Sequence, residues 1–240
     1  SGPNFVLNTV VGKELKEFAD ILEKSEDFNS DLHDVIVKTI KEHERILFNG
    51  NGYDDSWIEE AEKRGLCNLK TTPDCLPYFL SDRNVSLFTE SGVLTKAEIE
   101  SRYDITLENY CKVIGIEAAT MLDMAKKEIL PAVTAYTKEL ADTANSKKSF
   151  ISNCECSYEE EMISKLSDLI LKLYSGVSVL EDKLNKTSEI EDITKLSVYY
   201  KDIIIPAMDD VREPADKLEV ITAKKYWPFP TYGDLLFGVR

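Results

Sequence analysis

The sequence predicts an all-α protein: long antiparallel helices form a bundle, shorter helices precede it, and an extended tail rich in aromatic residues and proline follows it. Three observations support this fold class. Apolar residues recur at alternating gaps of 3 and 4 along three long segments, which is the spacing of one helix face. Three stretches carry the S/T-x-x-E pattern of a helix start. No stretch of useful length alternates apolar and polar residues as a half-buried strand does.

The short helices come first along the chain. The pattern predicts helices over residues 4–23 and 31–48, and it predicts that Asn49–Gly52 closes the second of them. Asp54 or Asp55 is expected to cap a helix that Gly65 stops. Two more short helices are expected, one from Pro73 to about Leu80 and one from Val85 to Ser91, with Gly92 ending the latter. Thr95 and Glu98 form a predicted capping box before the bundle.

The first long helix of the bundle is predicted over residues 107–140. Pro131 lies inside it and lacks a backbone N–H, so we expect a kink there. The apolar stripe of this helix consists of Ile114, Ala118, Met121, Ala125, Ile129, Val133, Tyr136 and Leu140.

The central helix of the bundle carries the most regular pattern, and charged residues occupy its other faces. A stripe of this kind must be covered by neighbouring helices. The helices before and after it supply that cover, and the short connections favour an antiparallel arrangement. The predicted central stripe is Ile163, Leu166, Ile170, Leu173, Val177, Leu180 and Leu184.

The third long helix is predicted over residues 190–221, where Pro206 and Pro214 each mark a kink or break. Ser157–Glu160 and Ser188–Glu191 are predicted capping boxes that begin the second and third helices. The expected inward residues of the third helix are Ile193, Leu196, Tyr200, Ile203, Ala207, Val211, Ala215 and Leu218.

The tail after residue 225 holds four aromatic residues within Tyr226–Tyr232. Its two prolines force extended geometry on their neighbours, and exposed aromatic rings are costly in water. We therefore expect the tail to pack onto a surface of its own chain or of another subunit. The candidate packing or interface residues are Trp227, Phe229, Tyr232, Leu236 and Phe237. The chain is thus divided into residues 1–52, 53–104, 105–225 and a docked tail, 226–240.

Composition narrows the class of partner and compartment. The net charge of −15 argues against binding to nucleic acid or to anionic membranes, because both would repel the chain. No apolar run approaches the roughly 20 residues of a membrane span, and the first residues do not form a signal peptide. The missing initiator methionine suggests a processed product or a piece of a longer protein. The five scattered cysteines favour reduced thiols in the cytoplasm over a disulfide framework.

Motifs for chemistry are not found in the sequence. Neither G-x-x-x-x-G-K-[ST] nor G-x-G-x-x-G occurs, and Asn49–Gly52 follows a helix rather than a strand. The two histidines, His33 and His43, have no partner at ligand spacing, so we interpret them as packing or surface residues. Pairs such as Asp209–Asp210 are explained as solvated helix faces. We therefore predict no catalytic, cofactor-binding or metal-binding residue in this chain.

Several stretches resemble one known family, the long type III glutamine synthetases of bacteria. The similar segments follow one another over nearly the whole length, although none is a catalytic motif in itself. They are Gly2–Thr9 (GPNFVLNT), Lys41–Tyr53 (KEHERILFNGNGY), Ile116–Ala125 (IEAATMLDMA), Ile129–Val133 (ILPAV) and Trp227–Phe237 (WPFPTYGDLLF).

The resemblance implies a parent enzyme that condenses glutamate with ammonia, using ATP and a divalent metal, Mg²⁺ or Mn²⁺. It places the metal-binding glutamates and the ATP-binding strands upstream of this region. Residues 1–52 would be the closing helices of the catalytic domain, and the remainder a helical C-terminal extension. The family assembles as double-ring homo-oligomers, so the implied partners are other copies of the chain and the upstream catalytic domain. The alternative is an independent helical scaffold or adaptor without a catalytic parent.

Overall fold

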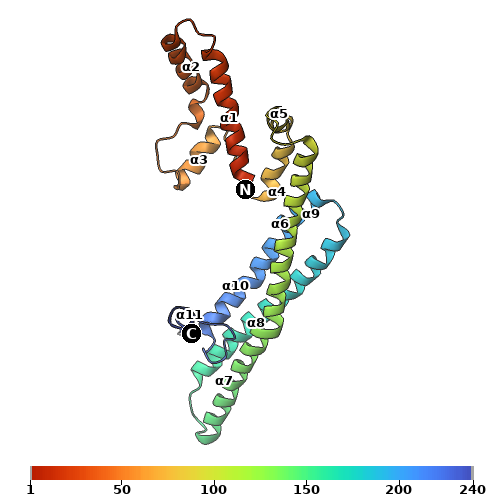
Figure 1. Cartoon of the computed structure of the whole chain (residues 1–240). Coiled ribbons are helices and arrows are strands. Elements are labelled where there is room, and N and C mark those ends of the chain that lie inside the picture. Colours follow the sequence, from red (N-terminus) through yellow and green to blue (C-terminus); the bar gives the residue numbers. More distant parts are fainter. Residues whose placement is uncertain (1, 239–240) are drawn as a thin grey trace. The chain divides into compact units, whose positions relative to one another are not determined.

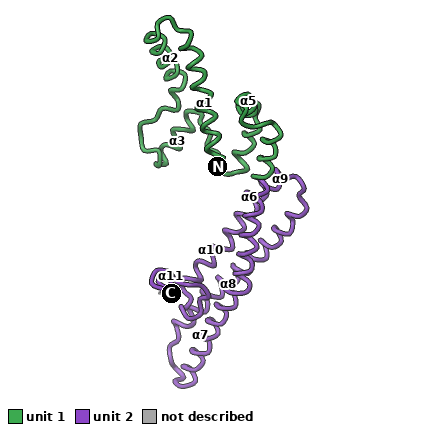
Figure 2. Tube along the Cα trace, viewed as in Figure 1, with its two compact units in different colours: residues 1–106 green, residues 107–240 purple. Residues whose placement is uncertain are grey.

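The computed structural model describes residues 2–238, and the residues in this range form helices, turns and loops without a β-strand. The all-α prediction is confirmed. The chain packs into two compact units, Ser1–Thr106 and Leu107–Arg240 (Figure 2). The four-part division expected from the sequence stays a prediction. No helix in the described range is long and apolar enough to cross a membrane.

The first unit consists of short helices followed by the beginning of α6. Its small core is formed by Phe88, Leu94 and Ile99, and the ring of Phe5 lies 5.7 Å from that of Phe88. The elements of this unit are α1 (Gly2–Leu22), α2 (Phe28–Glu42), a 3₁₀ turn (Glu44–Ile46), α3 (Asp55–Lys63), α4 (Thr72–Cys75), a 3₁₀ turn (Leu76–Leu80) and α5 (Asp82–Glu90).

Most predicted helix ends in the first unit are found. The Asp54 carboxylate accepts a hydrogen bond from the Ser56 N–H at the start of α3. Gly65 and Gly92, which have φ angles of 69° and 65°, adopt the left-handed conformation that glycine tolerates after α3 and α5. Thr95 and Glu98 form the predicted capping box, because each side chain accepts a hydrogen bond from the other's backbone N–H.

The predicted end of the second helix is wrong. The α-helix stops at Glu42 rather than at Phe48, and Asn49–Gly52 lies in the loop beyond a separate 3₁₀ turn. Neither Gly50 nor Gly52 has the positive φ of a helix-closing glycine. Leu47 is extended, with φ −78° and ψ 115°, and its carbonyl accepts a hydrogen bond of 2.8 Å from the Arg64 guanidinium in place of an intrahelical one.

The second unit is the helical bundle. Helix α8 packs against α7 along one side and against α10 along another (Figure 1). Short connections of six residues before α8 and seven after it reverse the chain, so neighbouring long helices run antiparallel, as predicted. The elements are α6 (Lys96–Met124), a π turn (Ala125–Ile129), α7 (Leu130–Phe150), α8 (Ser157–Asn185), a 3₁₀ turn (Lys186–Glu189), α9 (Ile193–Tyr199), a π turn (Tyr200–Ile204), α10 (Ile205–Ile221) and α11 (Tyr232–Phe237).

The predicted central stripe forms the middle of the bundle core. Four of its residues are buried in α8, namely Leu166, Leu173, Val177 and Leu180. The other three, Ile163, Ile170 and Leu184, are half-buried and pack against the same core. The periodicity of the sequence therefore identified the buried face of α8 correctly.

Each proline at the head of a long helix is preceded by a π-helical turn. One turn is followed by Leu130-Pro131 and the other by Ile205-Pro206. The wider turn accommodates the missing proline N–H. Where kinks were expected, the helix therefore shows a local change in its hydrogen bonding. Ile204 is fully buried where Ile203 was predicted, because it lies four residues after Tyr200 and three before Ala207 on the buried stripe. Pro214 is buried inside α10 without breaking that helix.

The two predicted serine caps of the bundle are wrong. Cys156 occupies the N-cap of α8, and the Ser157 hydroxyl instead donates a hydrogen bond of 2.7 Å to the Glu155 carboxylate. The third long helix begins at Ile193, where the Asp192 carboxylate accepts from the Lys195 N–H at 2.8 Å. Ser188 lies in the preceding 3₁₀ turn, so its S-x-x-E pattern caps no helix.

Candidate packing and interface site

The chain reverses direction after α10 and returns to the bundle. The backbone N–H groups of Tyr226 and Trp227 both donate to the Ala223 carbonyl, at 2.8 and 3.2 Å. This turn ends the helix and starts the segment that contains the candidate interface residues. The residues before Pro228 and Pro230 lie outside any helix, but the predicted extended tail is only partly found, because a helix begins at Tyr232.

Glu139 of α7 is the polar anchor of this segment. Its carboxylate accepts a hydrogen bond from the Tyr226 hydroxyl, and the Lys225 ammonium lies 2.9 Å from its Oε1. The Tyr226 ring also lies 5.4 Å from the ring of Tyr136, one turn earlier in α7. Burial raises the pKa of Tyr136, and its hydrogen bond with Tyr158 adds to that rise. Contacts of both kinds therefore hold the start of the tail on α7.

Two of the candidate residues, Trp227 and Phe229, pack against the bundle core. Both are half-buried, and their rings meet edge to face with centroids 6.0 Å apart. The indole Nε1 of Trp227 is buried without a hydrogen-bond partner among the described residues. The apolar contacts of these rings therefore outweigh the cost of one unsatisfied donor.

The end of the tail is a short helix, α11, which the sequence analysis did not anticipate. Thr231 and Asp234 form a capping box at its start. The Lys224 ammonium lies 2.7 Å from the Asp234 carboxylate and ties this cap to the end of α10. The hydrogen bond from Lys224, followed by those from Thr231, holds the pKa of Asp234 well below its usual range.

The remaining candidate residues lie on α11 and face away from the protein. Tyr232 and Phe237 are each 81% exposed, and Leu236 is 67% exposed. Leu235, which the sequence analysis did not select, is 70% exposed beside them. Two of the five candidate residues are thus docked on the bundle, and the other three are exposed on α11. We define the α11 surface as Tyr232, Leu235, Leu236 and Phe237.

A second apolar surface lies on the first unit. Helix α1 buries only Thr9, and α2 buries no residue. The α1–α2 surface consists of the exposed apolar residues Leu7, Val10, Val11, Leu15, Ile21, Phe28, Ile36 and Ile40, which are 41–62% exposed. Apolar exposure on this scale within two helices is typical of a surface that packs against another body.

Side chains suited to chemistry do not converge in the described range. His33 and His43 are both exposed. No group of three or more histidine, cysteine, aspartate or glutamate residues within 2–238 is placed to hold a metal ion. The five cysteines are free thiols.

The polar contacts that hold the tail were not predicted from the sequence. One of them could have been, because Thr231-x-x-Asp234 is a local capping pattern. Glu139 gives no such signal, because its partners lie 86 and 87 residues further along the chain. Contacts at that separation are set by the packing of the bundle.

These features define the class as a helical module with exposed apolar surfaces. Comparisons with known proteins then specify it. Residues 31–148 match the family described as glutamine synthetase C-terminal domain. The chain is 39% identical over 230 residues to a glutamine synthetase of Butyrivibrio fibrisolvens and 33% identical over 242 residues to a type-3 glutamine synthetase of Dictyostelium discoideum.

The alignments cover 94% and 98% of this chain, and the chain spans about a third of the length of either relative, 33% in each case. A glutamine synthetase of Bacteroides fragilis (strain YCH46) is 24% identical over 241 residues, again with 33% of its length covered. By these matches, the chain is similar to the C-terminal domain of the glutamine synthetase family. This finding confirms the family resemblance and disfavours the independent adaptor.

Proposed function

We propose that this chain is the helical C-terminal portion of a glutamine synthetase and that it contributes structure and assembly rather than chemistry. The observation that carries the proposal is the exposed α1–α2 surface, because a helix pair that buries one residue needs a partner body. The comparisons support the choice of that body, since two thirds of each relative lie outside the matched region.

The partner of the α1–α2 surface is the upstream catalytic domain of the same enzyme. Residues 1–52 then complete that domain, and the bundle extends from it. The α11 surface serves a second contact, between subunits of a homo-oligomer. Trp227 and Phe229 pack against the bundle core and so fix the position of the α11 surface on the bundle.

The whole enzyme would join ammonia to glutamate in the cytoplasm. ATP phosphorylates the γ-carboxylate of glutamate, ammonia then displaces phosphate, and Mg²⁺ or Mn²⁺ neutralises the phosphates. As the family resemblance implies, we place the residues for that chemistry in the upstream domain. The free cysteines fit a reducing compartment.

An activity assay tests whether the chemistry resides outside this chain. The isolated chain, incubated with glutamate, ammonia, ATP and magnesium, should release ADP only at the background rate. The full-length enzyme, assayed in parallel, should turn over. Turnover by the isolated chain that a substitution within residues 1–240 abolishes would show that the chain has an active site of its own.

A binding experiment tests the proposed partner. The upstream domain, produced separately, should bind the chain, and Leu7→Ser with Leu15→Ser should weaken that binding. The matched control is Leu171→Ser, which changes an equally exposed leucine (64%) on α8 in the other unit. Equal binding by both variants would contradict the role of the α1–α2 surface.

A further inference from the structure

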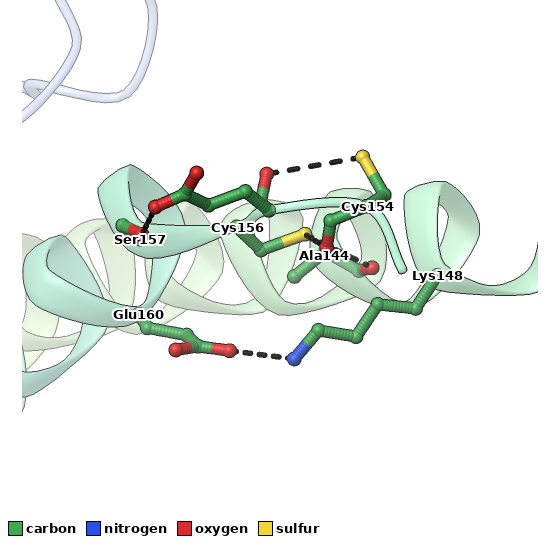
Figure 3. A network of polar contacts seen from close by, with 7 residues as sticks. Ala144, Lys148, Cys154, Cys156, Ser157 and Glu160 are labelled. Atoms are coloured by element: carbon green, nitrogen blue, oxygen red, sulfur yellow. Dashed lines mark hydrogen bonds and ion pairs between the residues drawn. The ribbon is translucent and has the colours of Figure 1, made fainter. Parts of the chain in front are cut away.

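Two thiols lie one residue apart in the six-residue loop between α7 and α8. Cys156 is 3% exposed, and its Sγ lies 3.7 Å from the Ala144 carbonyl near the end of α7. Cys154 is half-buried, and its Sγ lies 3.8 Å from the Glu155 carbonyl on another side of the loop (Figure 3). One thiol is therefore accessible, whereas the other links the two helices.

Charges of both signs surround this pair. Lys147 and Lys148, at the end of α7, reach across the turn to Glu159 and Glu160 of α8. The Lys148 ammonium lies 2.5 Å from the Glu160 carboxylate (Figure 3). Burial, the neighbouring Cys154 and the Glu159 carboxylate raise the pKa of the Cys156 thiol, and the two ammonium groups offset only part of that rise. Cys156 is therefore the less reactive thiol of the pair.

The backbone allows the two sulfur atoms to meet. Residues i and i+2 have Cα atoms at most about 7 Å apart even in a fully extended chain. A disulfide needs a Cα separation of about 4.4–6.8 Å. The loop is not helical, and its neighbours Phe150 and Ile151 are 94% and 64% exposed, so a small bend meets little resistance.

We propose that Cys154 and Cys156 form a redox-responsive dithiol, which a hydroperoxide converts reversibly into an intramolecular disulfide. The accessible Cys154 thiolate attacks the peroxide, so an S–O bond forms, the O–O bond breaks and hydroxide leaves to become water. Cys156 then attacks the sulfenic acid; the S–S bond forms, the S–O bond breaks and a second water leaves. Two thiols and one hydrogen peroxide thus yield one disulfide and two waters.

Oxidation has a structural consequence in the bundle. Cys156 must turn its sulfur away from the Ala144 carbonyl to reach Cys154, and its hydrogen bond to α7 is lost. The two lysine–glutamate pairs then remain as polar contacts between the end of α7 and α8. The dithiol therefore couples the oxidation state to the local order of the α7–α8 turn.

Peptide mapping tests the chemistry directly. After treatment with hydrogen peroxide, trypsin releases a peptide of residues 149–165 that contains Cys154 and Cys156 and no other cysteine, whereas Cys67, Cys75 and Cys111 lie in separate peptides. We expect this peptide to lose two hydrogens and both alkylation sites first, and dithiothreitol to restore them. Peptide 149–165 that stays reduced while other cysteines oxidise, or that goes directly to sulfinic acid, would overturn the proposal.

Two variants assign the roles. In Cys156→Ser, Cys154 should stop at the sulfenic acid, which dimedone traps. In Cys154→Ser, Cys156 should stay reduced, and equal oxidation of Cys156 would contradict the order of attack. Amide hydrogen exchange of residues 144–150 should rise on oxidation of the unsubstituted chain and fall again on reduction. Unchanged exchange in the presence of the disulfide would overturn the coupling to α7.

Discussion

Gly176 of α8 faces the Asp210 carbonyl of α10 so closely that a β-carbon added at Gly176 would lie 3.2 Å from that oxygen. The same carbon would lie 3.3 Å from Cγ2 of Val211, which is buried. Both neighbours are fixed, one by the helix backbone and the other by the core. The close approach of α8 and α10 therefore depends on the missing side chain.

Gly176→Ala should lower the stability of the bundle although alanine favours helices. Overpacking of a fixed contact costs about 1–3 kcal/mol, which exceeds the gain in helix propensity of about 0.5–1 kcal/mol. Urea denaturation followed by helix circular dichroism measures the difference.

The control for this change is Gly12→Ala in α1. A β-carbon at Gly12 meets nothing within 4 Å, so only the helix propensity acts and the variant should be slightly more stable. A stabilising effect at both glycines would show that α8 and α10 can separate without cost.

Leu173→Ala should destabilise the bundle by about 2–5 kcal/mol, as large-to-small changes at packed sites do. The leucine is fully buried at the centre of α8. The neighbouring Lys172 is exposed, so Lys172→Ala should have little effect. Equal melting temperatures for the two variants would contradict the assignment of the buried face.

The buried face of α8 could be predicted because every residue of a regular helix keeps the same angular spacing. Leu173 and its partners therefore fall on one stripe whatever surrounds them. The same rule left a choice between Ile203 and Ile204, because positions three and four residues after Tyr200 both lie near its face; Ile204 is the buried one. Beyond the π turn at Tyr200–Ile204, Ala207 and Val211 are buried as predicted.

Helix starts were harder to predict than helix faces. The S-x-x-E pattern at Ser157 is present, yet the serine hydroxyl bonds to Glu155, and Cys156 takes the cap position. A capping pattern states which hydrogen bonds are available, whereas the loop before the helix decides which of them form. The same pattern at Thr95 was correct.

The candidate site was only partly visible in the sequence. Aromatic composition and the prolines indicated a nonhelical segment, and Trp227 and Phe229 do lie against the bundle. The Thr231–Asp234 cap is a local pattern, but the contact of Glu139 with Lys225 forms only because the chain turns at Ala223. Local patterns do not encode such distant pairings.

Glu139→Ala should loosen the tail. The substitution removes the acceptor of the Tyr226 hydroxyl and the counterion of Lys225, and hydrogen bonds to charged groups contribute roughly 1.5–3 kcal/mol when shielded from water. Trypsin should then cut after Lys224 or Lys225 faster than in the unsubstituted chain. Glu108→Ala, at an exposed position of α6, is the matched control and should leave the cleavage rate unchanged.

Acid should unfold the cap of α11 before it unfolds the bundle. The Lys224 ammonium and the Thr231 donors hold the pKa of Asp234 below its ordinary value of about 3.9. The carboxylate is therefore stabilised in the folded state, and this contribution is complete above the unfolded pKa and is lost as pH falls below it. NMR signals of Leu235 should shift below about pH 4, and they should do so at higher pH in Lys224→Met. Identical titrations in the two proteins would exclude the ion pair as the cause.

The central claim is that the helical extension holds the enzyme together. Removal of the residues after Ser101 from the full-length enzyme, followed by sedimentation velocity and a glutamine synthesis assay, tests it most directly. We expect smaller particles than the intact enzyme and a rate that falls with the loss of assembly. Particles of unchanged subunit number with an unchanged rate would contradict the assembly role.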